Sequence, residues 1–461
     1  AGVQLRWEDG PPAPSWARNH SSAVQNGEFV GTEVARLVQA QVIRRWTTRP
    51  TVVSPLGVVD QDGKLRMILD LRYVNSHLSE IKFKYETLAK LPEILRPGDY
   101  TFVADLKSGY HHIDMHENAW EYLGFEWELA YYVFTQLPFG LAPACWVFTK
   151  LMREVLRHWR RGHRVTNYID DILGAAGTPL ESFAFQTEVL SDLERLGLMI
   201  SPGKLQAAAT HAQAAQQCTC LGAVVDTAAG HVRVMDKKKA KLLAAARAVL
   251  ERKPPRATVQ ELMAIRGRLQ DMRPAFGPLV SLKSFRLKEL VVEGAGPDPR
   301  RPRLQRWVAV HADAQAELEW WCTHFDSFNG SRELWPRAGP VHEIHSDAAG
   351  RSPEGLGGWG AWTDDGRGGV LRAAGRWRPP ESLEAHCHST WQEVRAADHA
   401  LRSFNSAGRF DGGEVRLVVD NQAAESLINK LGSRKRELRD LLESLFWYCY
   451  SRRIRLSSRW V

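Results

Sequence analysis

The sequence predicts an α+β fold over about residues 29–230 and a separate α/β unit over residues 339–461, with a helix-rich stretch, 231–338, between them. Short apolar segments bounded by Gly, Pro and Asp alternate with amphipathic helices in the first region. In the last region, three strands precede a helix, a strand, further helices and a final strand, which is typical of an α/β sheet. A chain of 461 residues is too long for one core, so several domains are expected.

The composition is that of a globular protein with an excess of positive charge. Hydrophobic residues make up 44% of the chain, the net charge is +8 and the isoelectric point is about 9.2. A basic balance favours a polyanionic partner. The six cysteines include no Cys-x-x-Cys pair, which argues against a zinc site. We expect the cysteines to be reduced and the protein to be intracellular, in the cytoplasm or the nucleus.

The N-terminal stretch, residues 1–28, is polar and Pro-rich, and we expect an irregular lead-in. We find no signal peptide and no apolar run long enough to span a bilayer. The chain begins at Ala1 without a methionine, so we expect it to be a fragment of a longer polyprotein. Apolar residues at helical spacing from Val34 to Val42 predict a helix over 32–46.

A charged hairpin is predicted next. Strands at 56–59 and 65–71 flank Asp62-Gly63, a strong turn signal. Lys64, Arg66 and Arg72 stand in or beside this hairpin, where their charges serve either as a solvated face or as a clamp on a triphosphate.

A buried acid and a rigid loop follow. The strand from Phe102 to Leu106 contains Asp105, whose burial is costly unless it caps the next turn or has a chemical task. Pro and Gly residues then make the loop LPFGLAPA rigid, and a helix is predicted over 144–159.

Asp170 and Asp171 interrupt an apolar run, which predicts two buried strands joined by a tight turn. Two adjacent carboxylates repel each other, and a divalent cation would remove that cost. The alternative is a polar hairpin tip. A helix over 180–196 follows, Gly197 ends it, and Lys204 lies in the loop beyond.

The middle stretch is predicted to be mainly helical. The lysine run 237–239 begins a basic amphipathic helix and is either a solvated face or a nucleic-acid contact. Thr258 and Glu261 form a capping-box signature. Residues 293–303 are rich in Gly, Pro and Arg and predict a linker or an exposed loop.

Three acids stand out in the C-terminal unit. Asp347 follows a strand that starts at Val341, and Asp420 follows a strand over 415–419, so both lie at carboxyl ends of strands. Glu393 lies on a helix for which Ser389 and Gln392 predict a capping box. Residues 454–460 predict one more strand.

The order of these motifs resembles that of reverse transcriptases. ADLKSGY with Asp105, LPFGLAPA, YIDD, Lys204 and TCLGAVVD follow one another as in that family, after a fingers-like segment, SPLGVVDQDGKLRMILDLRYVN. The C-terminal unit resembles type I ribonuclease H, and ELEWW in the join resembles polyproteins of DIRS-type retrotransposons, with a relative of the long-terminal-repeat elements as the alternative. The resemblance implies a right-hand polymerase, with fingers and palm over 29–230 and thumb and connection over 231–338, followed by a ribonuclease H-like domain over 339–461.

This resemblance implies a role for each candidate residue. Asp105, Asp170 and Asp171 would hold two Mg²⁺ ions, with Mn²⁺ as an alternative, because nucleotidyl transfer needs such a pair. Other roles are implied for the following residues: Lys64 and Arg66 on the incoming triphosphate, Tyr110 under its sugar, Phe139 and Gly140 in the pocket, Lys204 as proton donor to pyrophosphate, and Leu221 and Gly222 at the primer end. The implied partners are RNA template, DNA primer, RNA–DNA hybrid, deoxynucleoside triphosphates and other domains of the same polyprotein, without a membrane.

In the C-terminal unit, Asp347, Glu393 and Asp420 match the first three acids of ribonuclease H and would hold its metal ions. The family's fourth acid lies in a final helix, and the sequence stops at Val461 before such a helix. We therefore expect this chain to cleave the RNA of a hybrid weakly or not at all.

Two alternatives come from other functional classes. A domesticated, non-catalytic nucleic-acid-binding protein would not need the intact set Asp105, Asp170 and Asp171. An RNA-directed RNA polymerase is disfavoured by Tyr110, because a bulky ring under the sugar would exclude a 2′-hydroxyl.

Overall fold

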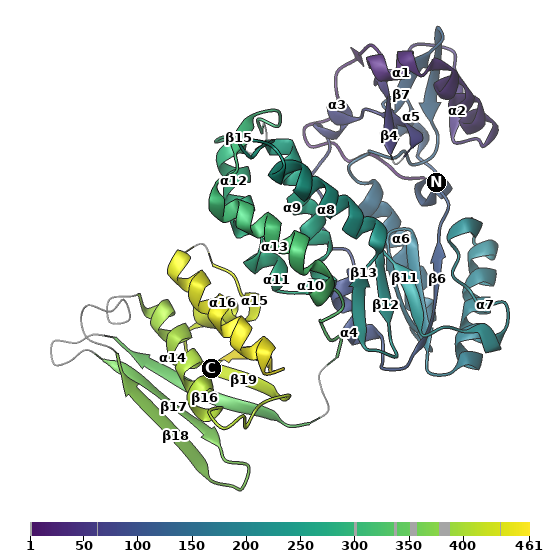
Figure 1. Cartoon of the computed structure of the whole chain (residues 1–461). Helices are drawn as coiled ribbons and strands as arrows, with labels where there is room; N and C mark the ends of the chain where they lie inside the picture. The colour runs from purple at the N-terminus through teal and green to yellow at the C-terminus, as the bar shows by residue number, and fades with distance from the viewer. Residues whose placement is uncertain are drawn as a thin grey trace. The chain divides into compact units, whose positions relative to one another are not determined.

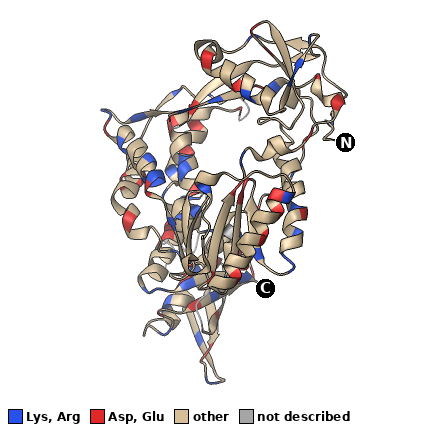
Figure 2. Cartoon of the chain, turned by 90° about the vertical axis from the view of Figure 1, so that its right-hand side faces the viewer, with Lys and Arg blue, Asp and Glu red and all other residues tan. Residues whose placement is uncertain are grey.

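The computed structural model describes residues 2–61, 63–298, 302–335, 339–350, 357–377, 388–433 and 435–461. The chain divides into two compact units (Figure 1). The first contains the residues up to Leu221 together with Val225–Ala229, and the second contains Gly222–Val224 and Gly230–Val461. Lys and Arg positions are mixed with Asp and Glu positions along most helices (Figure 2), so the net positive charge is a small excess spread over the chain.

The first part of unit one is a five-stranded sheet in the order β1-β3-β7-β8-β2 beside a separate hairpin, β4-β5. Its elements as far as residue 94 are β1 (Ser15–Trp16), α1 (Ser21–Gln25), α2 (Gly27–Gln39), β2 (Ile43–Trp46), β3 (Val52–Val53), β4 (Leu56–Gln61), β5 (Lys64–Leu69), α3 (Arg72–Asn75), η1 (Leu88–Lys90) and α4 (Leu91–Ile94). The hairpin expected around Gly63 is confirmed, although Asp62 lies outside the described residues.

The N-terminal stretch is tied to this sheet by backbone hydrogen bonds. Val3 N–H donates to Asp114 O, Glu8 N–H donates to His77 O, and β1 pairs in parallel with β3. The stretch is irregular as far as residue 20 apart from β1, but α1 and the start of α2 lie within residues 21–28, where an irregular lead-in was expected.

The prediction of one helix through Trp46 is wrong, because α2 ends at Gln39. Gln41 adopts a left-handed φ of 59°, its N–H donates to Val38 O, and Val42 N–H donates to Leu37 O. This pair of bonds is a Schellman motif, which ends a helix and usually has glycine at the left-handed position. Ile43 then begins strand β2.

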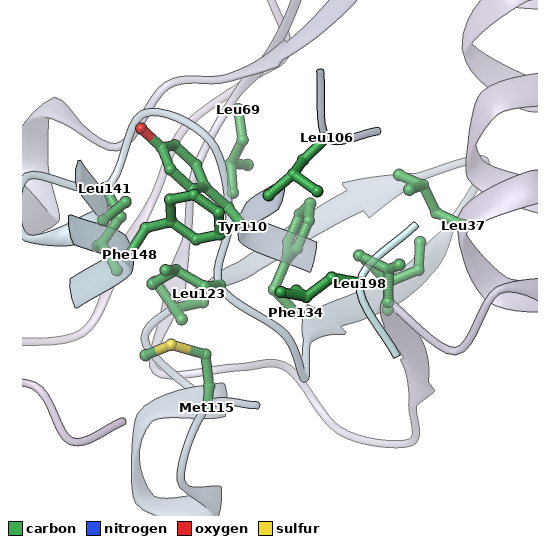
Figure 3. Packing of buried hydrophobic residues seen from close by; sticks show 14 of the residues in the cluster. Leu37, Leu69, Leu106, Tyr110, Met115, Leu123, Phe134, Leu141, Phe148 and Leu198 are labelled. Carbon is green, nitrogen blue, oxygen red and sulfur yellow. The ribbon is translucent and has the colours of Figure 1, made fainter. Parts of the chain in front are cut away.

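The rest of unit one is built on a three-stranded antiparallel sheet in the order β6-β10-β9. The elements from residue 100 onward are β6 (Tyr100–Asp105), η2 (Gly109–His112), α5 (Glu117–Trp120), β7 (Gly124–Trp127), β8 (Ala130–Phe134), α6 (Ala144–Trp159), β9 (Arg164–Tyr168), β10 (Asp171–Ala176), α7 (Pro179–Arg195), η3 (Pro202–Lys204), η4 (His211–Gln213) and β11 (Gln217–Cys220), of which β7 and β8 return to the five-stranded sheet. The predicted strand at 102–106, helix at 144–159 and hairpin at 165–176 are confirmed. One continuous core includes Phe102, Phe148 and Phe185, and Figure 3 shows Tyr110 and Phe148 side by side within it.

The first part of unit two is mainly helical, as expected. Its elements are β12 (Ala223–Asp226), β13 (His231–Val234), α8 (Asp236–Leu250), β14 (Arg256–Thr258), α9 (Val259–Asp271), α10 (Arg273–Phe276), α11 (Leu279–Leu282), α12 (Phe285–Ala295), β15 (Trp307–Ala309) and α13 (Ala312–Phe328). The capping box of Thr258 and Glu261 is confirmed. In the lysine run, Lys239 pairs with Asp326 at 2.5 Å, so this lysine has a structural partner. The linker expected from residue 293 starts later, because α12 continues through Ala295.

The remainder of unit two is a five-stranded mixed sheet in the order β18-β17-β16-β19-β20. Its elements are β16 (Val341–Ala349), β17 (Gly358–Asp364), β18 (Val370–Arg376), α14 (Ser389–Phe404), β19 (Glu414–Val419), α15 (Gln422–Lys430), α16 (Arg436–Ser451) and β20 (Arg455–Trp460). The predicted order of strands and helices is confirmed, and α14, α15 and α16 lie against one face of the sheet (Figure 1). The predicted capping box is wrong: Ser389 is the first helical residue, and the His388 ring accepts the Trp391 N–H instead.

Among the described residues, no helix is both long enough and apolar enough to cross a lipid bilayer.

Candidate active site

The first acidic cluster is assembled by strand pairing. β10 pairs antiparallel with β6, and the register places Asp171 opposite Asp105. Asp170 occupies the turn immediately before β10, and its carbonyl accepts the Leu106 N–H. The sequence-predicted acids therefore come together at one end of the β6-β10-β9 sheet.

The turn that carries Asp170 has an uncommon backbone. Ile169 adopts a φ of 54°, a left-handed conformation that is unfavourable for a β-branched residue and is found most often at functional sites. Gly109 lies against this turn, and a Cβ at that position would sit 2.5 Å from Asp170 Oδ1 and 2.8 Å from the Phe148 ring. Only glycine leaves room for the carboxylate.

The cluster holds more negative charge than its surroundings balance. Burial, followed by repulsion from Asp105 and Asp171, raises the pKa of Asp170 to about 6. Burial and Asp105 raise the pKa of Asp171 to about 6 as well. Asp105 is 7% exposed, and its Oδ2 accepts a hydrogen bond from Lys204 Nζ at 2.7 Å. Lys204, expected as a proton donor, is thus the counter-ion of Asp105.

The residues of this cluster fit a divalent cation. Asp170 Oδ1 is buried and has no hydrogen-bond partner among the described residues. A buried carboxylate oxygen without a donor is costly, and it is the hard oxygen ligand that Mg²⁺ prefers. The Lys204 ammonium hydrogen-bonds to Asp105, and its charge does not offset the burial and repulsion that raise the pKa of Asp170 and Asp171, so these two carboxylates suit a cation as ligands.

These shifted pKa values predict that Asp170→Asn stabilises the metal-free protein near neutral pH. The folded-state pKa lies above that of an unfolded carboxyl, so the folded chain binds more protons between about pH 4 and 6, and stability falls as the pH rises through that window. With allowance for solvent screening, removing the charge should raise the free energy of unfolding by on the order of 1 kcal/mol, which corresponds to a rise in Tm of about 2–4 °C at pH 7.5.

The measurement is thermal unfolding of both proteins in chelator, at about pH 7.5 and again near pH 4, where the difference should vanish. Excess Mg²⁺ should raise the Tm of the unsubstituted protein more than that of Asp170→Asn. A lower Tm for the variant at neutral pH would mean that Asp170 has a stabilising partner in the fold.

Tyr110 and Phe139, predicted to line the substrate pocket, are in contact. Their ring centroids are 4.9 Å apart, and Phe148 supports Tyr110 from the core at 5.5 Å. Tyr110 is 6% exposed and Phe139 is 47% exposed, so the Phe139 ring is open to solvent and the Tyr110 ring that it contacts is buried. The Tyr110 hydroxyl lies 2.8 Å from Cys145 Sγ, a contact that the sequence did not reveal.

Gly140 lines an open cavity of about 410 Å³ whose other walls come from the start of α1, β4, β5 and α3. Asn75 fixes the loop beside this cavity, because its side chain donates to Gly140 O and accepts the Ala142 N–H, both at 2.8 Å. Arg72 and Asp70 also line the cavity and form an ion pair that holds the pKa of Asp70 well below its usual range.

Some predicted positions lie apart from this cavity. Lys64 and Arg66 are exposed on β5 and are not among the residues that line it. Asn75 and Asp70 were missed as site residues, since polar residues beside a short helix give no distinguishing sequence signal. Leu221 and Gly222, expected at the primer end, form a tight turn with φ of 51° and 70°.

The second acidic cluster lies in unit two. Asp347 from β16, Glu393 from α14 and Asp420 after β19 each place a carboxylate oxygen within 4.8 Å of the others. Glu393 is 6% exposed, and burial with repulsion from Asp420 and Asp347 raises its pKa to about 7. Its Oε2 has no hydrogen-bond partner among the described residues. These three acids also fit a divalent cation.

A cavity of about 300 Å³ adjoins this second cluster. Asp347 and Asp420 line it together with Arg372 and Trp362, which sequence reasoning missed. The Trp362 ring stacks on His345 with centroids 3.8 Å apart and is 45% exposed. An exposed aromatic ring and a guanidinium beside an acidic cluster suit a polyanionic substrate that also carries rings.

Comparison with known proteins finds similarity in the first region. Residues 58–225 match the family model described as "Reverse transcriptase (RNA-dependent DNA polymerase)". The chain is 29% identical over 167 residues to the retrovirus-related Pol polyprotein from transposon gypsy of Drosophila melanogaster, covering 35% of this chain and 16% of that protein. It is 28% identical over 172 residues to the Pro-Pol polyprotein of simian foamy virus type 1, covering 37% of this chain and 14% of that protein. The chain thus spans about a sixth of the length of such relatives.

Solved structures give the fold of the whole chain. The foamy viral protease-reverse transcriptase bound to double-stranded DNA matches 99% of this chain and 89% of its own, with a TM-score of 0.58 and 18% identity. The same kind of protein bound to an RNA/DNA hybrid matches 99% of this chain and 57% of its own, with a TM-score of 0.60 and 17% identity. The chain therefore has the reverse transcriptase polymerase fold.

Proposed function

We propose that this chain, in which residues 58–225 form a reverse transcriptase domain of the retrotransposon and retroviral Pol type, copies RNA into DNA from a primer. The observation that carries this proposal is the first acidic cluster. Strand pairing sets Asp105 opposite Asp171, beside the buried and unpartnered Asp170 Oδ1. Relatives of this fold have been solved with double-stranded DNA and with an RNA/DNA hybrid, which supports a primer–template as the partner.

The three carboxylates would hold Mg²⁺, or Mn²⁺ in its place, and Asp105 would exchange its Lys204 partner for the cation. When bound, two such ions supply positive charge to the primer 3′-hydroxyl and to the leaving pyrophosphate. Lys204 is then free to face the pyrophosphate oxygens and donate a proton. Lys64 and Arg66 on the exposed hairpin strand are suited to the triphosphate, since guanidinium and ammonium groups pair with phosphate.

The direct test is extension of a labelled primer on an RNA template with Mg²⁺ and deoxynucleotides. Processive extension is expected, with a DNA template run in parallel to measure template preference. If the protein binds primer–template but extends neither, the domesticated, non-catalytic alternative is the better description.

Tyr110 is proposed to select deoxynucleotides. The ring is held on three sides, by Phe139, Phe148 and Cys145, so it cannot move away from a 2′-hydroxyl placed above it. Tyr110→Val should therefore raise the ratio of ribonucleotide to deoxynucleotide incorporation by about tenfold or more, mainly through the ribonucleotide. Single-nucleotide insertion kinetics with dGTP and GTP measure this ratio.

Phe102→Leu serves as the control for general loosening of the same core, because Phe102 is a buried residue of that core whose ring packs on Phe185. A ratio that stays constant in Tyr110→Val, or that rises equally in Phe102→Leu, would remove Tyr110 from this role.

We also propose that the C-terminal unit is a ribonuclease H-like domain that degrades RNA in RNA–DNA hybrids. The convergence of Asp347, Glu393 and Asp420 from a strand, a helix and a strand end supports this activity, because phosphodiester cleavage needs a metal-binding acidic cluster. We propose that the chain comes from a retrotransposon of the DIRS type, because α13 contains the sequence ELEWW.

A further inference from the structure

Three metal-ligating side chains gather in unit one at a place that the polymerase chemistry does not use. Ligand atoms of His158, Glu188 and Asp192 all lie within 4.8 Å of one another. His163 lies outside this group but contacts one member of it, because its Nε2 is 3.1 Å from Glu188 Oε2. The group offers one imidazole nitrogen and two carboxylates, with a second imidazole beside Glu188.

Two elements hold this set in place. His158 lies in the last turn of α6, which ends at Trp159, and His163 follows that helix end. Glu188 and Asp192 are four residues apart on α7, so they share one face of that helix. The end of α6 therefore brings His158, and the face of α7 brings Glu188 and Asp192, to one location.

The ligands rest on a rigid base. The His163 ring stacks on Phe185 with centroids 3.9 Å apart and planes 9° apart, and Phe185 is fully buried. Trp159 is 1% exposed, and its Nε1 donates to Asp192 Oδ2 at 2.8 Å. A donor fixed in the core and bonded to a ligating carboxylate is the outer-shell support that protein metal sites use.

The competing interpretation is a set of ordinary surface ion pairs. Two ion pairs form here without a metal, one between His163 and Glu188 and one between Arg195 and Asp192. The Arg195 side chain is 75% exposed, and such pairs contribute little to stability, so a cation could displace it at small cost. Ion pairs alone also do not require two histidines at this helix end.

We propose that His158, Glu188 and Asp192 form a site for a divalent transition-metal ion, Zn²⁺ in the first instance, which joins the end of α6 to α7, and that His163 holds the Glu188 carboxylate in place. Imidazole with carboxylate is a ligand set that suits Zn²⁺ and its first-row neighbours, whereas Mg²⁺ prefers oxygen alone. The missing Cys-x-x-Cys pair argues only against thiolate zinc sites. The role is structural, since the ion would lock two helices that pack on the β6-β10-β9 sheet.

The test is metal binding by the full chain, with no need for polymerase activity. The chelator-treated protein is titrated with ZnCl₂ in excess Mg²⁺, which saturates the two all-carboxylate clusters, and Co²⁺ absorption reports nitrogen ligation. We expect one equivalent of Zn²⁺ to bind and the Tm to rise by several degrees. His163→Asn and Glu188→Gln should each weaken binding by about 10–100-fold.

His211→Asn is the matched control, because His211 is an exposed histidine of the same unit that lies outside the set. It should bind Zn²⁺ as the unsubstituted protein does. If a variant unfolds, as judged by circular dichroism, His158→Asn replaces it. Absence of Zn²⁺ binding in excess Mg²⁺, or equal affinity in all variants, would leave the four residues as ion pairs and overturn the proposal.

Discussion

Asp170→Asn is expected to reduce Mg²⁺-dependent primer extension by about a thousandfold or more while leaving primer–template affinity within about twofold. Metal ions supply several kcal/mol of charge stabilisation in the transition state, and each 1.4 kcal/mol or so is a factor of ten in rate. Asparagine keeps the shape of the side chain next to Gly109 and removes the charge that a cation needs. Nucleic-acid binding depends mainly on Lys and Arg contacts with phosphates, which this change does not alter.

Single-turnover extension and a filter-binding or anisotropy titration, both at fixed salt, measure the two quantities. Asp9→Asn, at an exposed position, is the control and should extend at the unsubstituted rate. The predicted rise in metal-free Tm shows that the variant is folded, so lost activity cannot be ascribed to unfolding. Near-normal extension by Asp170→Asn would contradict the assignment of the first acidic cluster.

Much of the fold could be predicted because local signals and the tertiary structure agree. The paired strands around Asp170 and Asp171 follow from an apolar run broken at one place, and β9 and β10 form there. The helix over residues 144–159 follows a Pro/Gly loop and has the predicted bounds. In the C-terminal part of unit two, the order of elements could be predicted because strands such as β19 (Glu414–Val419) are apolar enough to be recognised alone.

The errors occur where an unusual residue takes the role of a common one. Gln41 rather than glycine occupies the left-handed position that ends α2, so the helical pattern continued without a visible stop. His388 caps α14 where serine or threonine is expected, so the capping box was placed one residue late. The end of α2 and the start of α14 both depend on backbone geometry that composition does not encode.

In the candidate active site, the contacts between residues far apart in the sequence could not be predicted. Sequence order identified Asp105 and Lys204, but their ion pair joins residues 99 positions apart and depends on how η3 packs beside β6. Asn75 binds the Gly140 loop across 65 positions, and nothing in its local sequence indicates this. Long-range contacts of this kind decide which charges are balanced, and they explain why Asp170 and Asp171 keep raised pKa values beside a lysine.

Glu393→Gln is expected to reduce cleavage of RNA in a labelled RNA–DNA hybrid by about a hundredfold or more, with primer extension unchanged. Glu393 is the buried acid of its cluster, and its Oε2 has no partner among the described residues, so a cation is the group that would satisfy it. Glutamine keeps the volume and removes the charge, and the remaining acids, Asp347 and Asp420, are exposed. Because the pKa of Glu393 is raised to about 7, protons compete with the metal as the pH falls through that value.

We expect weak cleavage by the unsubstituted chain, because its cluster has three acids. Cleavage is measured with Mg²⁺ and with Mn²⁺ between about pH 6 and 8.5, and its rate should rise with pH. Mn²⁺ binding, measured in parallel, should weaken by about 10–100-fold in Glu393→Gln. Glu437→Gln, at the exposed start of α16, is the matched control and should leave both quantities unchanged. Primer extension separates the two clusters, because Asp170→Asn should abolish extension and retain cleavage. If Glu393→Gln binds Mn²⁺ and cleaves as the unsubstituted chain does, the three acids of unit two do not form a working nuclease site.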